Sequence, residues 1–147
     1  MAQTRRAEAT WSGNLLQGNG TINTVTSGAF GDLPVSWGSR TESPDGRTSP
    51  EELLAAAHAS CYSMALSNTL AKAGTPPERL EVSAEITADK MDAGWTVQRS
   101  VLTVRGRVPG ASDADFQTAA NTAKDGCPIS RALAGNVELS VEATLEG

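Results

Sequence analysis

The sequence is poor in the side chains that build metal sites, disulfide frameworks and aromatic cores. Its 147 residues include one histidine, two cysteines, three tryptophans, two phenylalanines and one tyrosine. A four-ligand zinc site would have to recruit carboxylates, and none stands at a recognisable spacing from the histidine or the cysteines. We therefore expect no metal ion, and a core built from Val, Leu, Ile and Ala. The length favours a single domain, residues 1–147.

Long apolar runs and an excess of positive charge are also missing. No run approaches the roughly 18 apolar residues of a membrane-spanning helix, and the N-terminal residues lack the apolar segment of a secretory signal. The formal net charge is −5, and Arg5–Arg6 is the only adjacent basic pair. A negative protein is a poor ligand for nucleic acid or an anionic membrane. The sequence thus predicts a cytoplasmic protein with no nucleic acid and no membrane as its partner.

Residues 49–74 form the longest helical pattern in the sequence. Ser49 is placed to cap the helix, Pro50 fits its first position, and Glu52 completes a capping box with Ser49. Gly74 provides the expected stop. Between these ends the residues are small and apolar on nearly every face, which is typical of a buried helix. We expect part of its cover to come from a second copy of the protein.

The remaining patterns predict strands in groups, with two further helices. The predicted strands cover residues 6–17, 21–26, 33–37, 80–87, 95–108 and 137–145, and the predicted helices cover 113–125 and 128–134. Residues 18–20 indicate a turn, and residues 41–48 a surface loop. Because strands are grouped rather than alternating strictly with helices, the sequence predicts an α+β fold with mostly antiparallel pairing.

Cys61 lies inside the long helix and allows two interpretations. It is either a small buried hydrophobe or a reactive thiol. A reactive thiol requires a depressed pKa, and thus a cation or a helix N-terminus nearby. The dipole of the long helix has faded at this depth, so a cation must come from elsewhere. Arg40 is the best candidate, although it also fits a solvated arginine at the end of a strand.

Cys127 lies between a glycine and a proline, at the start of a predicted short helix. The helix dipole there favours a thiolate, so Cys127 looks like the more acidic of the two cysteines. An ordinary turn residue is an equally good interpretation. In a reducing compartment, two cysteines are more often free thiols or redox partners than a structural disulfide.

Three other polar residues of the long helix invite a functional interpretation. Glu51 and Glu52 stand in the first turn, where the helix dipole alone favours acids. His58 stands one turn before Cys61 on roughly the same face, a spacing that would allow a Cys–His dyad. No third group that would orient such a dyad is evident.

Two long motifs resemble those of a known family. Residues 49–67, with Cys61 among them, resemble the central helix of the OsmC/Ohr family of hydroperoxide peroxidases. Residues 127–133, which begin Cys-Pro-Ile-Ser, resemble that family's second cysteine motif. Residues 9–13, residues 18–21 and Arg40 resemble the OsmC branch rather than the Ohr branch. The similarity covers nearly the whole chain in the right order.

The resemblance implies a thiol peroxidase for oxidative or osmotic stress defence, without metal, haem or flavin. Cys61 would attack an organic hydroperoxide, Cys127 would resolve the product as a disulfide, and an external dithiol of the lipoyl type would reduce that disulfide. Arg40 would hold the Cys61 thiolate, and Glu51 would orient Arg40. The family's fold is an intertwined homodimer, in which sheets wrap around central helices.

One distance conflicts with these roles, and two other functions remain open. In a straight helix Glu51 and Cys61 are about 15 Å apart along the axis, too far to share Arg40. Either the helix breaks near residues 55–58, or chain crossing in the dimer brings the groups together. The alternative functions are a non-catalytic carrier of small molecules that uses an apolar dimer groove, and a redox-sensing interaction protein.

Overall fold

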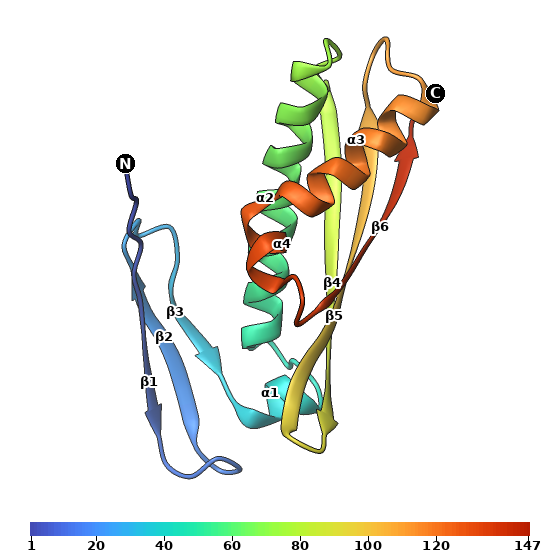
Figure 1. The fold of residues 1–147 in the computed structure, drawn as a ribbon. Coiled ribbons are helices and arrows are strands. Elements are labelled where there is room, and N and C mark those ends of the chain that lie inside the picture. Colours follow the sequence, from blue (N-terminus) through green and yellow to red (C-terminus); the bar gives the residue numbers. More distant parts are fainter. The chain divides into compact units, whose positions relative to one another are not determined.

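The computed structural model describes all 147 residues, which form two compact units, Met1–Leu53 and Leu54–Gly147. The ten elements are shown in Figure 1 and are β1 (Ala7–Ser12), β2 (Asn19–Val25), β3 (Gly31–Val35), α1 (Trp37–Thr41), α2 (Pro50–Lys72), β4 (Arg79–Met91), β5 (Gly94–Arg107), α3 (Asp113–Gly126), α4 (Pro128–Leu133) and β6 (Glu138–Leu145). The α+β fold class is confirmed. None of the helices combines the length and the apolar character that crossing a bilayer requires.

The first unit is a three-stranded antiparallel sheet in the order β1-β2-β3. β1 is shorter than predicted because Gly13, at φ 92°, ends it. A turn follows, in which the Gly18 N–H donates to the Asn14 carbonyl at 2.9 Å. Gly20, expected in a turn, lies in β2 and is the only buried residue of the unit. A Cβ there would lie 2.7 Å from the Trp11 ring, so only glycine fits.

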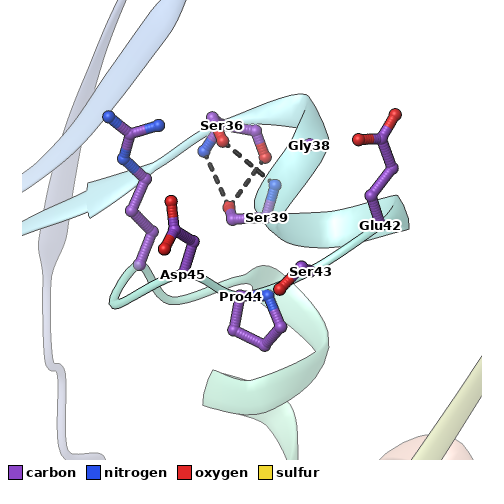
Figure 2. A pocket seen from close by; sticks show the side chains of 8 residues that line it. Ser36, Gly38, Ser39, Glu42, Ser43, Pro44 and Asp45 are labelled. Atoms are coloured by element: carbon purple, nitrogen blue, oxygen red, sulfur yellow. Dashed lines mark hydrogen bonds between the residues drawn. The ribbon is translucent and has the colours of Figure 1, made fainter.

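α1 replaces the end of the predicted third strand. Its capping box is reciprocal: the Ser39 N–H donates to Ser36 Oγ, and the Ser36 N–H donates to Ser39 Oγ, both at 3.0 Å. Figure 2 shows the two side chains facing each other across this cap. Ser39 Oγ also contacts the Thr48 carbonyl at 3.0 Å. This bond ties α1 to the end of the loop that leads into α2.

The cap and the glycine stop of α2 are as the sequence predicted, but the Glu52 carboxylate, expected to complete the capping box with Ser49, accepts instead from the Thr48 hydroxyl at 2.9 Å. The Glu52 N–H donates to Ser49 Oγ at 3.1 Å, and Gly74 takes a positive φ of 89° after the last turn. The helix continues without a break for 23 residues. The suggested break near residues 55–58 is therefore wrong, and Glu51 stays about 15 Å from Cys61 along the axis.

Only one face of α2 is buried within the chain. The buried side chains recur every four residues, as on one face of a helix, and are His58, Tyr62, Leu66 and Leu70. Met64, by contrast, is 67% exposed. A single chain thus covers one face of α2, and the cover expected from a second copy stays a prediction.

The second unit has a three-stranded sheet in the order β4-β5-β6. β4 and β5 form a long antiparallel hairpin, whereas β6 pairs parallel to β5. α3 and α4 connect β5 to β6, as a parallel pair requires. Antiparallel pairing dominates the two sheets, as predicted, and β6 is the exception.

The core lies between this sheet and the helices that cover it (Figure 1). Its largest side chains are Tyr62 and Leu66 from α2, Leu102 from β5 and Phe116 from α3. The Phe116 ring lies close to Gly106, where a Cβ would come within 2.7 Å of it. Through these side chains α2 and α3 pack against the same sheet. Both helices contribute to the site described next.

Candidate active site

The fold brings the two cysteines together although they are 66 positions apart in the sequence. Cys61 projects from the middle of α2. Cys127 stands at the junction of α3 and α4: its N–H donates to the Ala123 carbonyl and its own carbonyl accepts from the Arg131 N–H, both at 2.9 Å. Both thiols are free, and their sulfur atoms are in hydrogen-bonding contact. The fold thus places both cysteines of the chain at one point, between α2 and the start of α4.

Access to solvent separates the two thiols. Cys61 is half-buried, whereas Cys127 is completely buried. Cys61 opens into a cleft of about 440 Å³. The cleft is lined by Cys61, Met64, Ala65, Asn68, Thr69, Thr122, Ala123, Gly126 and Pro128. A small molecule can reach Cys61 directly but cannot reach Cys127.

Burial raises the pKa of the Cys61 thiol. A hydrogen bond from the Ile129 backbone N–H lowers it, and the neighbouring Cys127 raises it further, so the net direction is upward. No positive side chain of Leu54–Gly147 contributes to lowering it. Cys61 also lies well beyond the first turn of an unbroken helix, where the dipole has little effect. A reactive Cys61 thus needs a cation from outside this unit.

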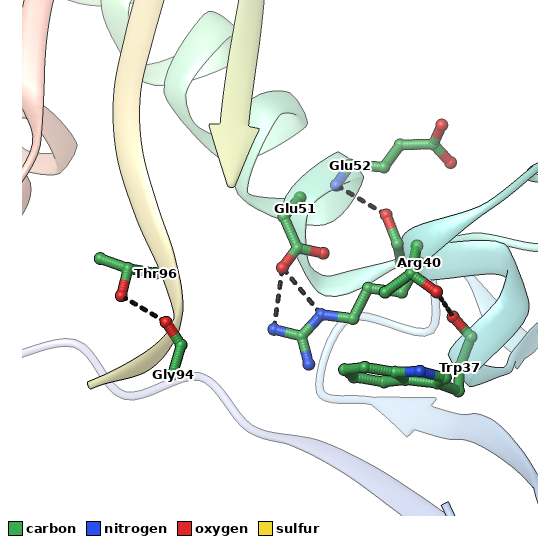
Figure 3. A network of polar contacts seen from close by, with 8 residues as sticks. Trp37, Arg40, Glu51, Glu52, Gly94 and Thr96 are labelled. Carbon is green, nitrogen blue, oxygen red and sulfur yellow. Dashed lines mark hydrogen bonds and ion pairs between the residues drawn. The ribbon is translucent and has the colours of Figure 1, made fainter. Parts of the chain in front are cut away.

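Arg40 and Glu51, the predicted cation and its orienting acid, form an ion pair in the first unit. Arg40 Nε and Nη2 both lie 2.8 Å from Glu51 Oε1 (Figure 3). The guanidinium also lies over the Trp37 ring, 5.8 Å from its centroid. The ion pair with Glu51 uses two of the three guanidinium nitrogens. Glu51 Oε2 is buried without a hydrogen-bond partner, so the carboxylate is held mainly by the arginine.

Arg40 also lines an apolar cleft of about 310 Å³ in the first unit. The other lining residues are Trp11, Leu15, Val35, Ser36, Trp37 and Pro50. A cation beside aromatic and aliphatic side chains suits an anion that carries an apolar group.

His58 does not form the suggested dyad with Cys61. Its ring is buried between two serines: Nδ1 lies 2.7 Å from Ser100 Oγ, and Nε2 lies 2.8 Å from Ser130 Oγ. Both nitrogens are therefore occupied, and burial lowers the His58 pKa. Sequence reasoning missed both partners. The only signal was a serine in an apolar strand pattern and another three positions after Cys127.

We expect His58 to make the protein sensitive to acid. Its pKa is lowered from 6.5 in the folded state, so below pH 6.5 the unfolded chain binds a proton that the folded chain does not. The free energy of unfolding then falls with decreasing pH by up to about 1.4 kcal/mol per pH unit. Urea unfolding at pH 7.5 and 5.5 should show a larger loss for wild type than for His58→Gln. Equal losses would contradict this assignment, because the other titrating groups are common to both proteins.

No three His, Cys, Asp or Glu side chains lie together in a way that could hold a metal ion. Of the predicted site residues, Cys61 contacts Cys127 and Arg40 forms an ion pair with Glu51. Each pair lies within one compact unit.

Comparison with known proteins gives consistent relatives. The OsmC-like protein family matches residues 43–142. Peroxiredoxin OsmC of Escherichia coli (strain K12) is 37% identical over 138 residues, which cover 94% of this chain and 95% of that protein. Organic hydroperoxide resistance protein OhrA of Bacillus subtilis (strain 168) is 31% identical over 101 residues, covering 65% and 66%. The solved structure of an OsmC-like protein from Mycoplasma pneumoniae has a TM-score of 0.75 at 15% identity, covers 100% of both chains, and supports the fold alone.

Proposed function

We propose that this chain, which belongs to the OsmC-like protein family, is a thiol-dependent peroxidase that reduces organic hydroperoxides to alcohols. The contact between an accessible Cys61 and a buried Cys127 carries this proposal. It supplies one sulfur that a peroxide can reach and a second that can trap the oxidised product. The names of the E. coli and B. subtilis relatives, a peroxiredoxin and an organic hydroperoxide resistance protein, support the same chemistry.

The proposed reaction has three steps. The Cys61 thiolate attacks the peroxide and breaks the O–O bond; sulfur keeps the hydroxyl as a sulfenic acid, and the alkoxide takes a proton and leaves as the alcohol. The Cys127 thiol then attacks the sulfenic sulfur, forming the disulfide and releasing water. An external dithiol of the lipoyl type finally returns two electrons and two protons and becomes a disulfide itself. No resident metal or cofactor is required by this sequence of steps.

The proposed assembly is a homodimer. β1 is exposed along all six residues, and the first unit buries only Gly20. Its exposed apolar side chains include Trp11 at 42% and Leu16 at 76%. A three-stranded sheet needs a buried apolar face to be stable, and exposed apolar surface of this kind marks an interface. A second copy would cover this face and the exposed side of α2.

The dimer also offers a solution to the activation of Cys61. Glu51 and Cys61 lie on one unbroken helix, about 15 Å apart along its axis. Because α2 has no break, we retain the other explanation raised by the sequence, which is chain crossing between copies. We therefore assign the arginine at each reaction site to the other copy, where it would stabilise the Cys61 thiolate. Glu51 would keep the guanidinium oriented, as it does in the observed ion pair.

Turnover of cumene hydroperoxide with dihydrolipoamide tests the proposed function. We expect the reduced protein to consume cumene hydroperoxide at least tenfold faster than hydrogen peroxide. The reason is that burying each CH₂ equivalent of the apolar group contributes about 0.8 kcal/mol, and 1.4 kcal/mol is a factor of ten. Peroxide consumption is followed directly, with protein alkylated at its thiols as the control. Absence of turnover by fully reduced protein would favour a non-catalytic binding protein instead.

A further inference from the structure

We propose that His58 is a positioning residue for disulfide formation, which anchors α4 through Ser130 so that Cys127 stays opposite Cys61. This inference rests on the proposed function, because it concerns the second step of that reaction. His58 does not touch the reacting sulfur atoms, since both of its ring nitrogens contact serines. Its effect is therefore exerted through the helix that carries the second cysteine.

The spacing of the contacts supports this role. His58 precedes Cys61 by three residues on α2, and Ser130 follows Cys127 by three residues on α4. Residues three apart lie on the same face of a helix, about one turn from each other. The hydrogen bond between His58 and Ser130 therefore lies about one helical turn from the contact between Cys61 and Cys127. A shift of α4 that breaks one contact disturbs the other.

α4 has few other means of holding its place. It is six residues long, the Cys127 side chain does not cap its N-terminus, and Ser130 is the only buried residue within it. A helix this short is not stable by itself. The same turn supplies the Ile129 N–H that contacts the Cys61 sulfur. Ile129 is half-buried against the core, and the hydrogen bond of His58 with Ser130 ties the buried side of α4 directly to α2.

Ser100 on β5 holds the His58 ring in the orientation that Ser130 needs. His58 and Ser100 are completely buried, and Ser130 is 1% exposed, so water does not compete for these bonds. A neutral imidazole donates from one nitrogen and accepts at the other, and a serine hydroxyl can do either. Both bonds therefore form with either tautomer. The ring links β5, α2 and α4 at one point.

The chemical consequence concerns the fate of the Cys61 sulfenic acid. Attack by the Cys127 thiol gives the disulfide and water, whereas attack on a second peroxide gives a sulfinic acid and a second alcohol. The first route is intramolecular and depends on the position of α4, while the second depends on peroxide concentration. Loss of the anchor should therefore shift the product from disulfide to sulfinic acid.

His58→Gln and His58→Asn separate the two hydrogen bonds. The glutamine amide reaches the position of Nε2 and can bind Ser130, whereas the shorter asparagine amide reaches only the position of Nδ1 and can bind Ser100. We expect His58→Asn to slow disulfide formation at least tenfold and to accumulate sulfinic acid at cumene hydroperoxide doses that leave wild type as disulfide. His58→Gln should stay within about threefold of wild type. Formation of the sulfenic acid should change only a few-fold in either variant.

Rapid quenching and intact-mass analysis measure these species, and circular dichroism establishes that equal amounts of folded protein are compared. Ser130→Ala removes the same bond without changing His58, so it should slow disulfide formation as His58→Asn is expected to do. It therefore provides the test even if His58→Asn does not fold. Disulfide formation at the wild-type rate in Ser130→Ala, or an equal slowing in His58→Gln and His58→Asn, would overturn the role of His58. Failure of wild type to form the disulfide would instead overturn the proposed function itself.

Discussion

Replacing Cys61 by serine abolishes peroxide reduction, whereas Cys127→Ser still reduces one equivalent of cumene hydroperoxide per chain. This result is expected because Cys61 lines the cleft and Cys127 is completely buried. A serine hydroxyl does not accept the peroxide oxygen as sulfur does, so Cys61→Ser loses the first step. Cys127→Ser keeps this step and stops at the sulfenic acid. Steady-state turnover with dihydrolipoamide should then fall at least tenfold.

A single-turnover experiment without reductant measures both variants. Reduced protein is mixed with one equivalent of cumene hydroperoxide per chain, so that a sulfenic acid meets no second peroxide, and dimedone labelling with mass spectrometry identifies the oxidised cysteine. The serine variants serve as each other's control, since each retains one thiol and a nearly unchanged volume. Peroxide reduction by Cys61→Ser in one turnover would make Cys127 the attacking thiol. The roles proposed for the two cysteines would then be reversed.

The elements with strong end signals were predictable from the sequence. α2 was expected over residues 49–74 and is observed over Pro50–Lys72, because its cap and its glycine stop act locally. β6 was expected from strict alternation of apolar and polar residues and is observed over Glu138–Leu145. α3 begins after Ser112, whose Oγ accepts from the Asp115 N–H at 3.1 Å, and α4 begins at Pro128, and both signals are local. Where local chemistry determines an element, the sequence is sufficient.

Other features depend on partners that a local pattern does not reveal. Alternation identifies β6 as a strand but does not determine that it runs parallel to β5. α1 was missed because its cap depends on two serines that exchange bonds in a segment that otherwise resembles a strand. β1 was predicted too long because the turn at residues 14–17 is stabilised by the Asn14 side chain, which accepts from the Gln17 N–H at 2.8 Å.

The candidate site likewise contains one pairing that was expected before the structure and one set of contacts that was not. The pairing of Arg40 with Glu51 was expected from the resemblance, and the structure places the two 2.8 Å apart. The position of His58 on the helix suggested a partner of Cys61, because sequence spacing gives the face of a residue and nothing about its surroundings. Its actual partners come from β5 and α4, 42 and 72 positions away. Long-range hydrogen bonds of this kind are beyond what a single sequence reveals.

Arg40→Ala should slow the reaction of Cys61 with peroxide by roughly tenfold to a thousandfold at pH 7. A neighbouring opposite charge shifts a pKa by about 1–3 units, and burial already raises the Cys61 pKa when no cation is present. Removing the arginine therefore leaves most of Cys61 as the unreactive thiol. The rate of sulfenic acid formation is measured across pH, and it should recover as pH rises in Arg40→Ala.

Mixed dimers test whether this arginine acts across copies. One mixed dimer combines an Arg40→Ala chain with a Cys61→Ser chain and is purified through two different tags. If the arginine acts in trans, the intact Arg40 of one chain faces the intact Cys61 of the other, which leaves one complete site. We therefore expect about half the wild-type activity. A dimer of wild type with a chain that carries both substitutions should lose at least about tenfold in activity, because its one remaining Cys61 then lacks the arginine. If the arginine instead acts within its own chain, the first mixed dimer loses its activity and the second keeps about half. A monomeric protein, or full activity of the Arg40→Ala homodimer, would remove the basis for the shared site.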